Sequence, residues 1–130
     1  MSHTVKIKTQ FKEFSILQRT LEEMGWTIKS NSAARAFSGD PNRDRVFPFV
    51  AVNPDTTQNS YDIGIVPTQN ELEVYGDFYG GSLASHFGIG LTKLKTAYAL
   101  NVIKDEYEQY GYTVDCSKHE NGSLIVEVYK

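Results

Sequence analysis

The sequence has one cysteine, four prolines and no long apolar run, and each scarcity excludes a class of protein. Cys116, being alone, cannot form a disulfide within the chain or a zinc site built from several cysteines, so we expect a reducing compartment. No apolar run approaches the ~18 residues of a membrane-spanning helix. The polar residues 1–4 also lack the apolar core of a signal peptide. We therefore expect a cytoplasmic protein without a membrane partner.

Positive charge is also in short supply. Lysine and arginine number 13 against 16 acidic residues, for a formal net charge of −3. The chain therefore has no general attraction to phosphate backbones or anionic lipid, and nucleic acid is not the expected partner. Hydrophobic residues make up 40% and charged residues 22%, which is ordinary for a globular protein. We predict one domain over residues 1–130, because this length suffices for a hydrophobic core.

Short runs with β-like composition, several of them alternating apolar and polar side chains, are predicted to be strands. Pro48 has no N–H to donate, so its strand is predicted to be an edge strand or to contain a bulge. Asn121 and Gly122 tolerate the positive φ angles of a two-residue turn and predict a hairpin between the last two runs. The seven runs cover residues 5–8, 26–29, 46–52, 61–66, 72–78, 112–117 and 123–129.

Two longer segments have the spacing of three and four residues that marks an amphipathic helix. The first runs from Phe11 to Met24 and is predicted to stop at Gly25. The second begins near Thr92 and ends at Gly111, and we expect it to be extensively buried because it has two apolar stripes. Residues 79–90, with four glycines, predict a flexible connection or a distorted helix entrance. The stripes are Leu94, Tyr98 and Val102, and then Ala97, Leu100, Ile103, Tyr107 and Tyr110.

The order of these elements is β-α-β-β-β-β-α-β-β. Runs of antiparallel strands interrupted by two helices are typical of the α+β class. We therefore predict a two-layer domain in which a mainly antiparallel sheet is covered by the two helices.

Short motifs spread along nearly the whole chain carry a resemblance to a known family. They are Ile7-Lys8-Thr9, Met24-Gly25-Trp26, Arg35-Ala36-Phe37, Tyr61-Asp62-Ile63-Gly64, Asp77-Phe78-Tyr79, Gln109-Tyr110-Gly111-Tyr112 and Asn121-Gly122-Ser123. In this order they resemble the hypothetical chloroplast reading frame thirty-five family, a domain of unknown function. The resemblance implies a cyanobacterium, a red-algal-type plastid or a phage of cyanobacteria as the source. It implies no activity, because the family has no established one.

Candidate chemistry in the sequence is sparse. No two of the histidines His3, His86 and His119 stand three or four residues apart, so no metal site and no cofactor are predicted. Cys116 lies in an alternating run with no visible cause for a thiolate, so no catalytic residue is predicted. The carboxylates of Asp62 and Asp77, on adjacent predicted strands, could converge as an acid–base pair. The glycines of residues 80–90 could then form a mobile lid.

Aromatic and arginine residues gather in a loop and the neighbouring strands. The eight tyrosines exceed what a small core supplies with hydroxyl partners, and arginine with tyrosine is typical of interface hot spots. We therefore favour a non-enzymatic protein-binding or regulatory module whose partner is another protein. One alternative is a small-molecule-binding protein or enzyme that uses Asp62 and Asp77, and another is a single-stranded nucleic-acid binder that stacks bases on sheet aromatics. The predicted binding face consists of Arg35, Phe37, Tyr61, Asp62, Asp77 and Tyr79.

Overall fold

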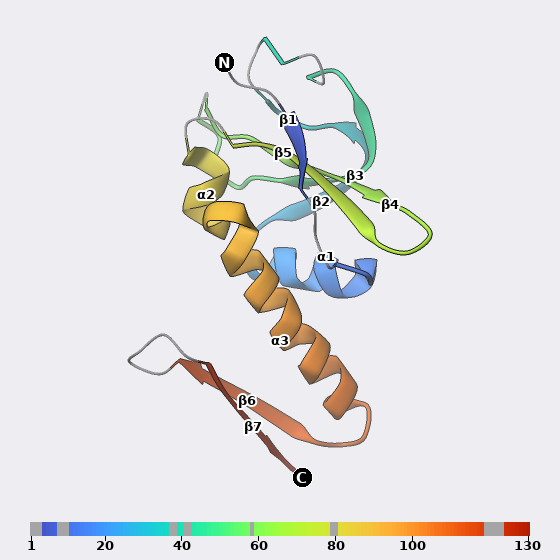
Figure 1. Ribbon diagram of the computed structural model, residues 1–130, viewed down its shortest axis with the longest axis vertical. Helices are drawn as coiled ribbons and strands as arrows, with labels where there is room; N and C mark the ends of the chain where they lie inside the picture. Colours follow the sequence, from blue (N-terminus) through green and yellow to red (C-terminus); the bar gives the residue numbers. More distant parts are fainter. Residues whose placement is uncertain are drawn as a thin grey trace.

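The computed structural model describes residues 4–7, 11–36, 39–40, 43–57, 59–78, 81–118 and 124–130. Figure 1 shows a sheet with helices in the upper part and the end of the longest helix with a hairpin in the lower part. The elements, in chain order, are β1 (Thr4–Ile7), α1 (Phe14–Glu23), β2 (Thr27–Ala33), β3 (Val46–Val52), β4 (Ile63–Pro67), β5 (Leu72–Asp77), α2 (Ser82–Phe87), the 3-10 helix η2 (Ile89–Leu91), α3 (Thr92–Glu108), β6 (Thr113–Lys118) and β7 (Leu124–Tyr129).

Five strands form one antiparallel sheet in the order β1-β5-β4-β3-β2. Strands β2, β3 and β4 each pair with the next strand along the chain, while β1 pairs with β5 at the edge opposite β2. Helix α1 links these two edges in the sequence. The predicted α+β class and the predicted order of strands and long helices are confirmed. The glycine-rich segment adds α2 and η2, which form a distorted entrance to α3.

The C-terminal hairpin stands apart from the main sheet. Within the described residues, β6 and β7 pair with each other and form a separate two-stranded sheet. Their register runs from Thr113↔Tyr129 to Lys118↔Leu124, which confirms the predicted strand pairing. The predicted turn at Asn121 and Gly122 lies outside the described residues. Figure 1 shows the hairpin beyond the main sheet, below α3, which it joins at the helix C-terminus.

One face of the main sheet packs against the helices and forms the larger hydrophobic core. Helix α1 contributes the stripe predicted from its sequence, with Ile16, Leu17 and Leu21 buried. The N-cap residue of this helix, Glu13, makes no capping hydrogen bond with its side chain. The sheet, α2 and α3 complete this core with Trp26, Ala51, Ile63, Ile65, Leu72, Val74, Leu83, Phe87, Leu91, Leu94 and Tyr98, among others.

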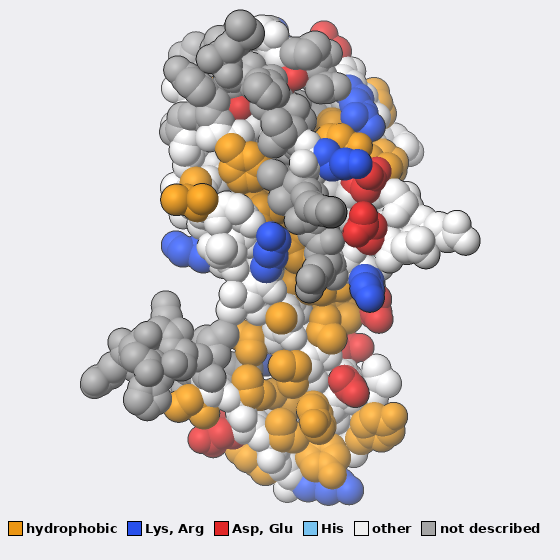
Figure 2. All heavy atoms as spheres, in the orientation of Figure 1, with side chains coloured by type: hydrophobic (Ala, Val, Ile, Leu, Met, Phe, Trp, Pro, Cys, Tyr) orange, Lys and Arg blue, Asp and Glu red, His pale blue; other side chains and the backbone are white. Residues whose placement is uncertain are grey.

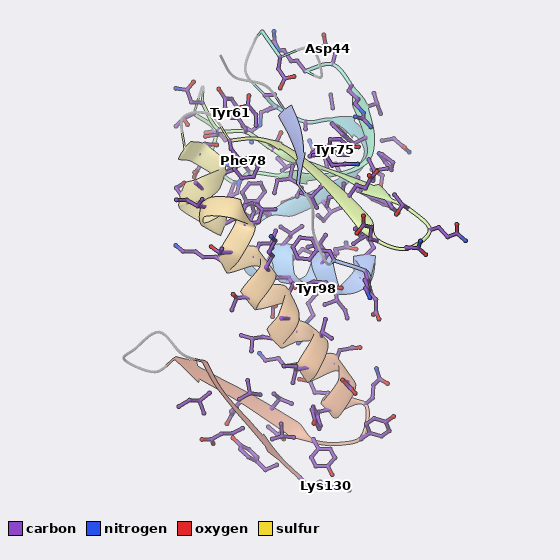
Figure 3. The ribbon with its side chains drawn as sticks, in the orientation of Figure 1. Asp44, Tyr61, Tyr75, Phe78, Tyr98 and Lys130 are labelled. Atoms are coloured by element: carbon purple, nitrogen blue, oxygen red, sulfur yellow. The ribbon has the colours of Figure 1, made fainter. Side chains whose placement is uncertain are left out.

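Helix α3 holds α1 through two buried polar side chains. The Tyr98 hydroxyl accepts hydrogen bonds from the backbone N–H groups of Lys12 and Glu13, both at 3.0 Å. It therefore satisfies donors at the start of α1 that no capping side chain reaches. Asn101 Nδ2 donates to Thr20 Oγ1 at 2.8 Å, near the end of the same helix. Figure 3 shows the Tyr98 side chain lying between the two helices.

Helix α1 ends as the sequence predicts. Gly25 has a φ of +90°, a left-handed conformation that costs glycine little. The N–H of Trp26 donates to the carbonyl of Leu21, and the N–H of Gly25 donates to that of Glu22, both at 3.0 Å. This pair of bonds is the Schellman motif, which satisfies carbonyls that the helix leaves unpaired. The chain is thereby turned from α1 directly into β2.

Pro48 does not mark an edge strand, because β3 lies between β2 and β4. The paired positions of β2 and β3 omit Asn31 and Pro48, which face each other, and Asn31 has a φ of +50°. The pairing of β3 with β4 begins only at Phe49. The irregular position at Asn31, opposite Pro48, therefore accommodates the missing N–H of the proline inside the sheet.

Candidate functional site

The structure describes four of the six residues of the predicted binding face. Tyr61, Asp62 and Asp77 are buried, whereas the Arg35 side chain keeps 39% of its surface exposed. Phe37 and Tyr79 lie outside the described residues. Of the four, therefore, only Arg35 offers substantial side-chain surface to a partner, and the other three belong to the framework around it.

Arg35 and Asp62 form a forked ion pair where the chain leaves β2 and enters β4. Arg35 Nε donates to Asp62 Oδ2 at 3.0 Å, and Nη2 donates to Oδ1 at 2.8 Å. The backbone N–H of Arg35 also donates to Oδ2, and that of Asn53 donates to Oδ1, each at 2.8 Å. These charge-assisted bonds compensate the removal of the carboxylate from water.

The same guanidinium ties down the loop that follows β3. Arg35 Nη2 donates to the carbonyl of Asn53 at 2.9 Å, and Nη1 donates to the carbonyl of Asp55 at 3.1 Å. The hydrogen bond to Asp62 raises the pKa of Arg35 above its ordinary value, against a lowering by partial burial. A raised pKa means that the stabilisation is present at lower pH and is lost only above that value. The ion pair is therefore constant over the neutral range.

A second pair of contacts joins this loop to α2. His86 Nε2 lies 2.8 Å from Asp55 Oδ2, and the Ser82 hydroxyl accepts the backbone N–H of Tyr61 at 3.0 Å. The His86 ring meets the buried Trp26 ring edge-on, with centroids 5.2 Å apart. Arg35, the loop and α2 therefore form one connected framework, in which these polar contacts fix the position of the chain.

An open groove of about 290 Å³ borders Arg35. Figure 3 shows the labelled side chains of Tyr61 and Asp44 in the upper part of the molecule. Neither Asp62 nor Asp77 lines the groove, so it does not present both carboxylates to one ligand. Its lining combines small apolar residues with charges of both signs: Ala33, Ala34, Arg35, Ala36, Arg43, Asp44, Ser60 and Tyr61.

The predicted proximity of Asp62 and Asp77 is supported by the strand register. Ile63 pairs with Gly76, so continuing the ladder by one position places Asp62 opposite Asp77. Both oxygens of Asp62, however, accept hydrogen bonds from Arg35 and Asn53. A carboxylate held in this way serves as a fixed counter-ion, and the acid–base hypothesis stays a prediction.

The aromatic rings on the second sheet face are covered. The Arg45 guanidinium lies 4.7 Å from the centroid of Phe47 and 4.6 Å from that of Tyr75. On its other side Phe47 rests on Gly64, where an added Cβ would stand 2.6 Å from the ring. A nucleic-acid base could stack on these rings only after Arg45 had moved, because the cation occupies the ring faces.

Metal and membrane sites find no support in the part of the chain that the structure describes. There, no three His, Cys, Asp or Glu side chains converge as metal ligands. His3 and His119 lie outside that part. Among the described helices, none combines the length and the apolar character needed to span a bilayer.

The C-terminal surface is a feature that sequence reasoning missed. It consists of the second half of α3, the turn that follows it and the β6–β7 hairpin, and it exposes 41% of Tyr107, 70% of Tyr110, 38% of Ile125 and 44% of Tyr129. Figure 2 shows apolar side chains gathered over this lower part of the molecule. The second apolar stripe of α3 was expected to be buried, and this expectation is wrong for Tyr107 and Tyr110, whereas the other three members are half-buried. A usable signal was that five of the eight tyrosines lie between residues 98 and 129.

Charge is also concentrated at the C-terminal end. Residues 101–130 contain six acidic and three basic residues, a formal charge of −3 that equals the net charge of the whole chain. Within α3, Lys93 and Lys95 lie near its start, whereas Asp105, Glu106 and Glu108 lie near its end together with a single lysine, Lys104. This distribution opposes the helix dipole, which favours acidic residues at the start and basic residues at the end.

Comparison with models of known protein families, with curated proteins and with solved structures gave no match. The resemblance drawn from the sequence motifs therefore stays a prediction. The site must be interpreted from its own geometry.

Proposed function

We propose that the chain is a non-enzymatic protein-binding module whose C-terminal surface binds an apolar helix of a protein partner. One observation carries the proposal. Six large apolar side chains of the described residues are exposed, and four of them lie on this surface. Scattered exposed apolar residues are ordinary, whereas a concentrated group marks an interaction site. The surface replaces the predicted face around Arg35, whose other described members are buried.

The packing of the hairpin supports this assignment. A two-stranded hairpin is at best marginally stable by itself and needs a covering layer. Val114 of β6 is buried, but Val126 and Val128 of β7 are only partly covered. Helix α3 thus covers one part of the hairpin, and a bound helix would cover more of its apolar surface.

The chemistry of the surface indicates the partner. Tyrosine supplies large contact area at low conformational cost and is enriched in interfaces. Acidic side chains surround the tyrosines, with Glu106 and Glu108 on α3, Asp115 on β6 and Glu127 on β7. A complementary partner therefore has an apolar helical face flanked by lysine or arginine, because opposite charges steer association.

Site-specific photo-crosslinking tests the proposal in cells that produce the full-length chain. A photoreactive phenylalanine analogue placed at Tyr110 is expected to give one discrete protein adduct. The same analogue at Val46 is the control, because Val46 is also a large, exposed apolar residue but lies in the main sheet. The adduct from position 110 should weaken when Glu106 is replaced by Lys, since the acidic rim is then lost.

Two results would contradict the proposal. Equal labelling from positions 110 and 46 would indicate contact without specificity. The absence of any discrete adduct from position 110, with the variant protein folded, would show that the C-terminal surface has no partner in these cells.

A further inference from the structure

We infer that the helix bound at the C-terminal surface is α3 of a second copy of the chain, in an antiparallel pair related by a two-fold axis. The inference rests on the proposed function and names its partner. It starts from the outer stripe along α3 and the turn that follows it, six residues spaced by four and three positions: Thr92, Thr96, Ala99, Ile103, Glu106 and, in the turn, Tyr110.

The outer stripe is open along its length. Five of its members are exposed and Ile103 is half-buried. The buried residues of α3, Leu94, Tyr98 and Asn101, lie on the opposite side of the helix and face α1. Alternating spacings of three and four residues present one continuous seam to a second helix, as in coiled coils.

The sizes of the side chains favour an antiparallel pair. The stripe begins with the small residues Thr92, Thr96 and Ala99 and continues with larger ones. A two-fold axis level with Asn101 places Ala99 opposite the second copy's Ile103. It also places Thr96 opposite Glu106 and Thr92 opposite Tyr110. Each layer then combines one small with one large side chain, so two helices can approach closely.

The charges favour the same arrangement. Lys95 lies beside the stripe on the same side as Glu106, a member of the stripe, and the two are eleven residues and so about three turns apart. In an antiparallel pair each Lys95 meets Glu106 of the other copy, with an axial offset of about 1.5 Å, the rise of one residue. The Lys95–Glu106 contact forms twice because the interface is isologous. The basic half of each helix also lies beside the acidic half of the other.

The antiparallel pair further explains the unfavourable charge order within α3. Lysines near the start and glutamates near the end oppose the dipole of their own helix. Beside an antiparallel neighbour, Lys93 and Lys95 approach the negative end of the second helix, and Glu106 and Glu108 approach its positive end. The arrangement that is unfavourable in one chain becomes favourable between two.

Sedimentation of the purified full-length chain at low salt and rising concentration tests the inference. We expect a species of twice the 14.6 kDa chain mass. Lys95→Glu alone and Glu106→Lys alone should each raise the dimer dissociation constant about tenfold, since each creates two like-charge contacts. The double variant Lys95→Glu/Glu106→Lys should restore the dimer, because the exchanged charges still match.

Matched controls separate the interface from general charge effects. Lys29→Glu and Glu22→Lys make the same charge changes at exposed positions outside α3 and should leave the dissociation constant unchanged. Ala99→Arg should also weaken the dimer, because it places a large residue opposite Ile103. Circular dichroism verifies that each variant is folded.

Each outcome of these experiments either supports or overturns the inference. A chain that stays monomeric at every concentration overturns the inference, and a photo-crosslinked adduct with a different protein would then leave the proposed function standing. A dimer that ignores the charge exchange and Ala99→Arg uses another surface and also overturns it. If no adduct forms in cells but the purified chain dimerises with the expected charge exchange, the pairing is correct but does not occur in those cells.

Discussion

Apolar side chains near the start of α3 and near its end differ in burial. Leu94 and Tyr98 are buried against the sheet and α1, whereas Tyr107 and Tyr110 are exposed beside the hairpin. An apolar stripe indicates that one face of a helix is stabilised by packing against a covering layer. It does not show whether that layer belongs to the same chain. The comparison therefore separates a self-sufficient body from a C-terminal unit that we propose to be completed by a partner.

The largest contrast is expected between two leucines of α3. Leu94→Ala should lower the free energy of unfolding by about 2–5 kcal/mol, because it removes a fully buried side chain and leaves a cavity. Leu100→Ala should cost below about 1.5 kcal/mol, because its site is half-open and leaves no closed cavity. Urea unfolding of both variants, at protein concentrations below the dimer dissociation constant, measures the difference in the free energy of unfolding. Equal costs would erase the distinction between the buried and the half-buried face of the helix.

Arg35 tests the framework of the body. Arg35→Ala should cost about 2–3 kcal/mol, somewhat below a fully buried pair, because Asp62 stays buried without its cation while the arginine is partly exposed. Arg35→Lys should cost less, since it keeps the charge and loses only the fork. Thermal melts at neutral pH measure both. If Arg35→Ala changed stability by below about 0.5 kcal/mol, as at an ordinary surface position, the framework would not depend on this ion pair.

Tyr98 and Tyr110 sharpen the comparison at the level of single hydroxyl groups. Tyr98→Phe should cost about 1–2 kcal/mol, because the N–H groups of Lys12 and Glu13 lose their acceptor. Tyr110→Phe should be neutral within about 0.5 kcal/mol, as expected for an exposed position. The measurement is again urea unfolding. A neutral Tyr98→Phe would mean that water satisfies the start of α1.

The smallest effect on stability is expected at Tyr110. Tyr110→Ser should change the free energy of unfolding of the monomer by less than about 0.5 kcal/mol. It should nevertheless weaken self-association about tenfold, because the interface loses its largest exposed ring. Sedimentation and urea unfolding of one sample measure the two quantities. A loss of association that merely follows unfolding would contradict a role at the surface.

Most elements could be predicted from local patterns because their causes are local. The apolar run Val46–Val52 predicts β3 at the observed residues, and Gly25 predicts the end of α1 through its left-handed conformation. The interior position of Pro48 could not be predicted in the same way. It depends on an irregular position in the neighbouring strand at Asn31, which lies far away in the sequence.

The candidate site was harder to predict than the fold. The predicted face placed Arg35 and Asp62 together with four other residues, and the structure joins Arg35 and Asp62 directly. Their burial could not be read from composition, because a charged residue is buried only where specific partners compensate it. The exposure of Tyr107 and Tyr110 was missed for a related reason, since it depends on how far the hairpin reaches across α3.

The sequence by itself determined the α+β class, the order of the strands and long helices, the hairpin pairing and the separation of charge along α3. These follow from the spacing of residues along one chain. Only the tertiary structure decided that β6 and β7 leave the main sheet, that Asp62 is enclosed by Arg35 and Asn53, and that the outer stripe of α3 stays open. Burial depends on which surfaces pack against each other in space, and these surfaces come from residues far apart in the sequence.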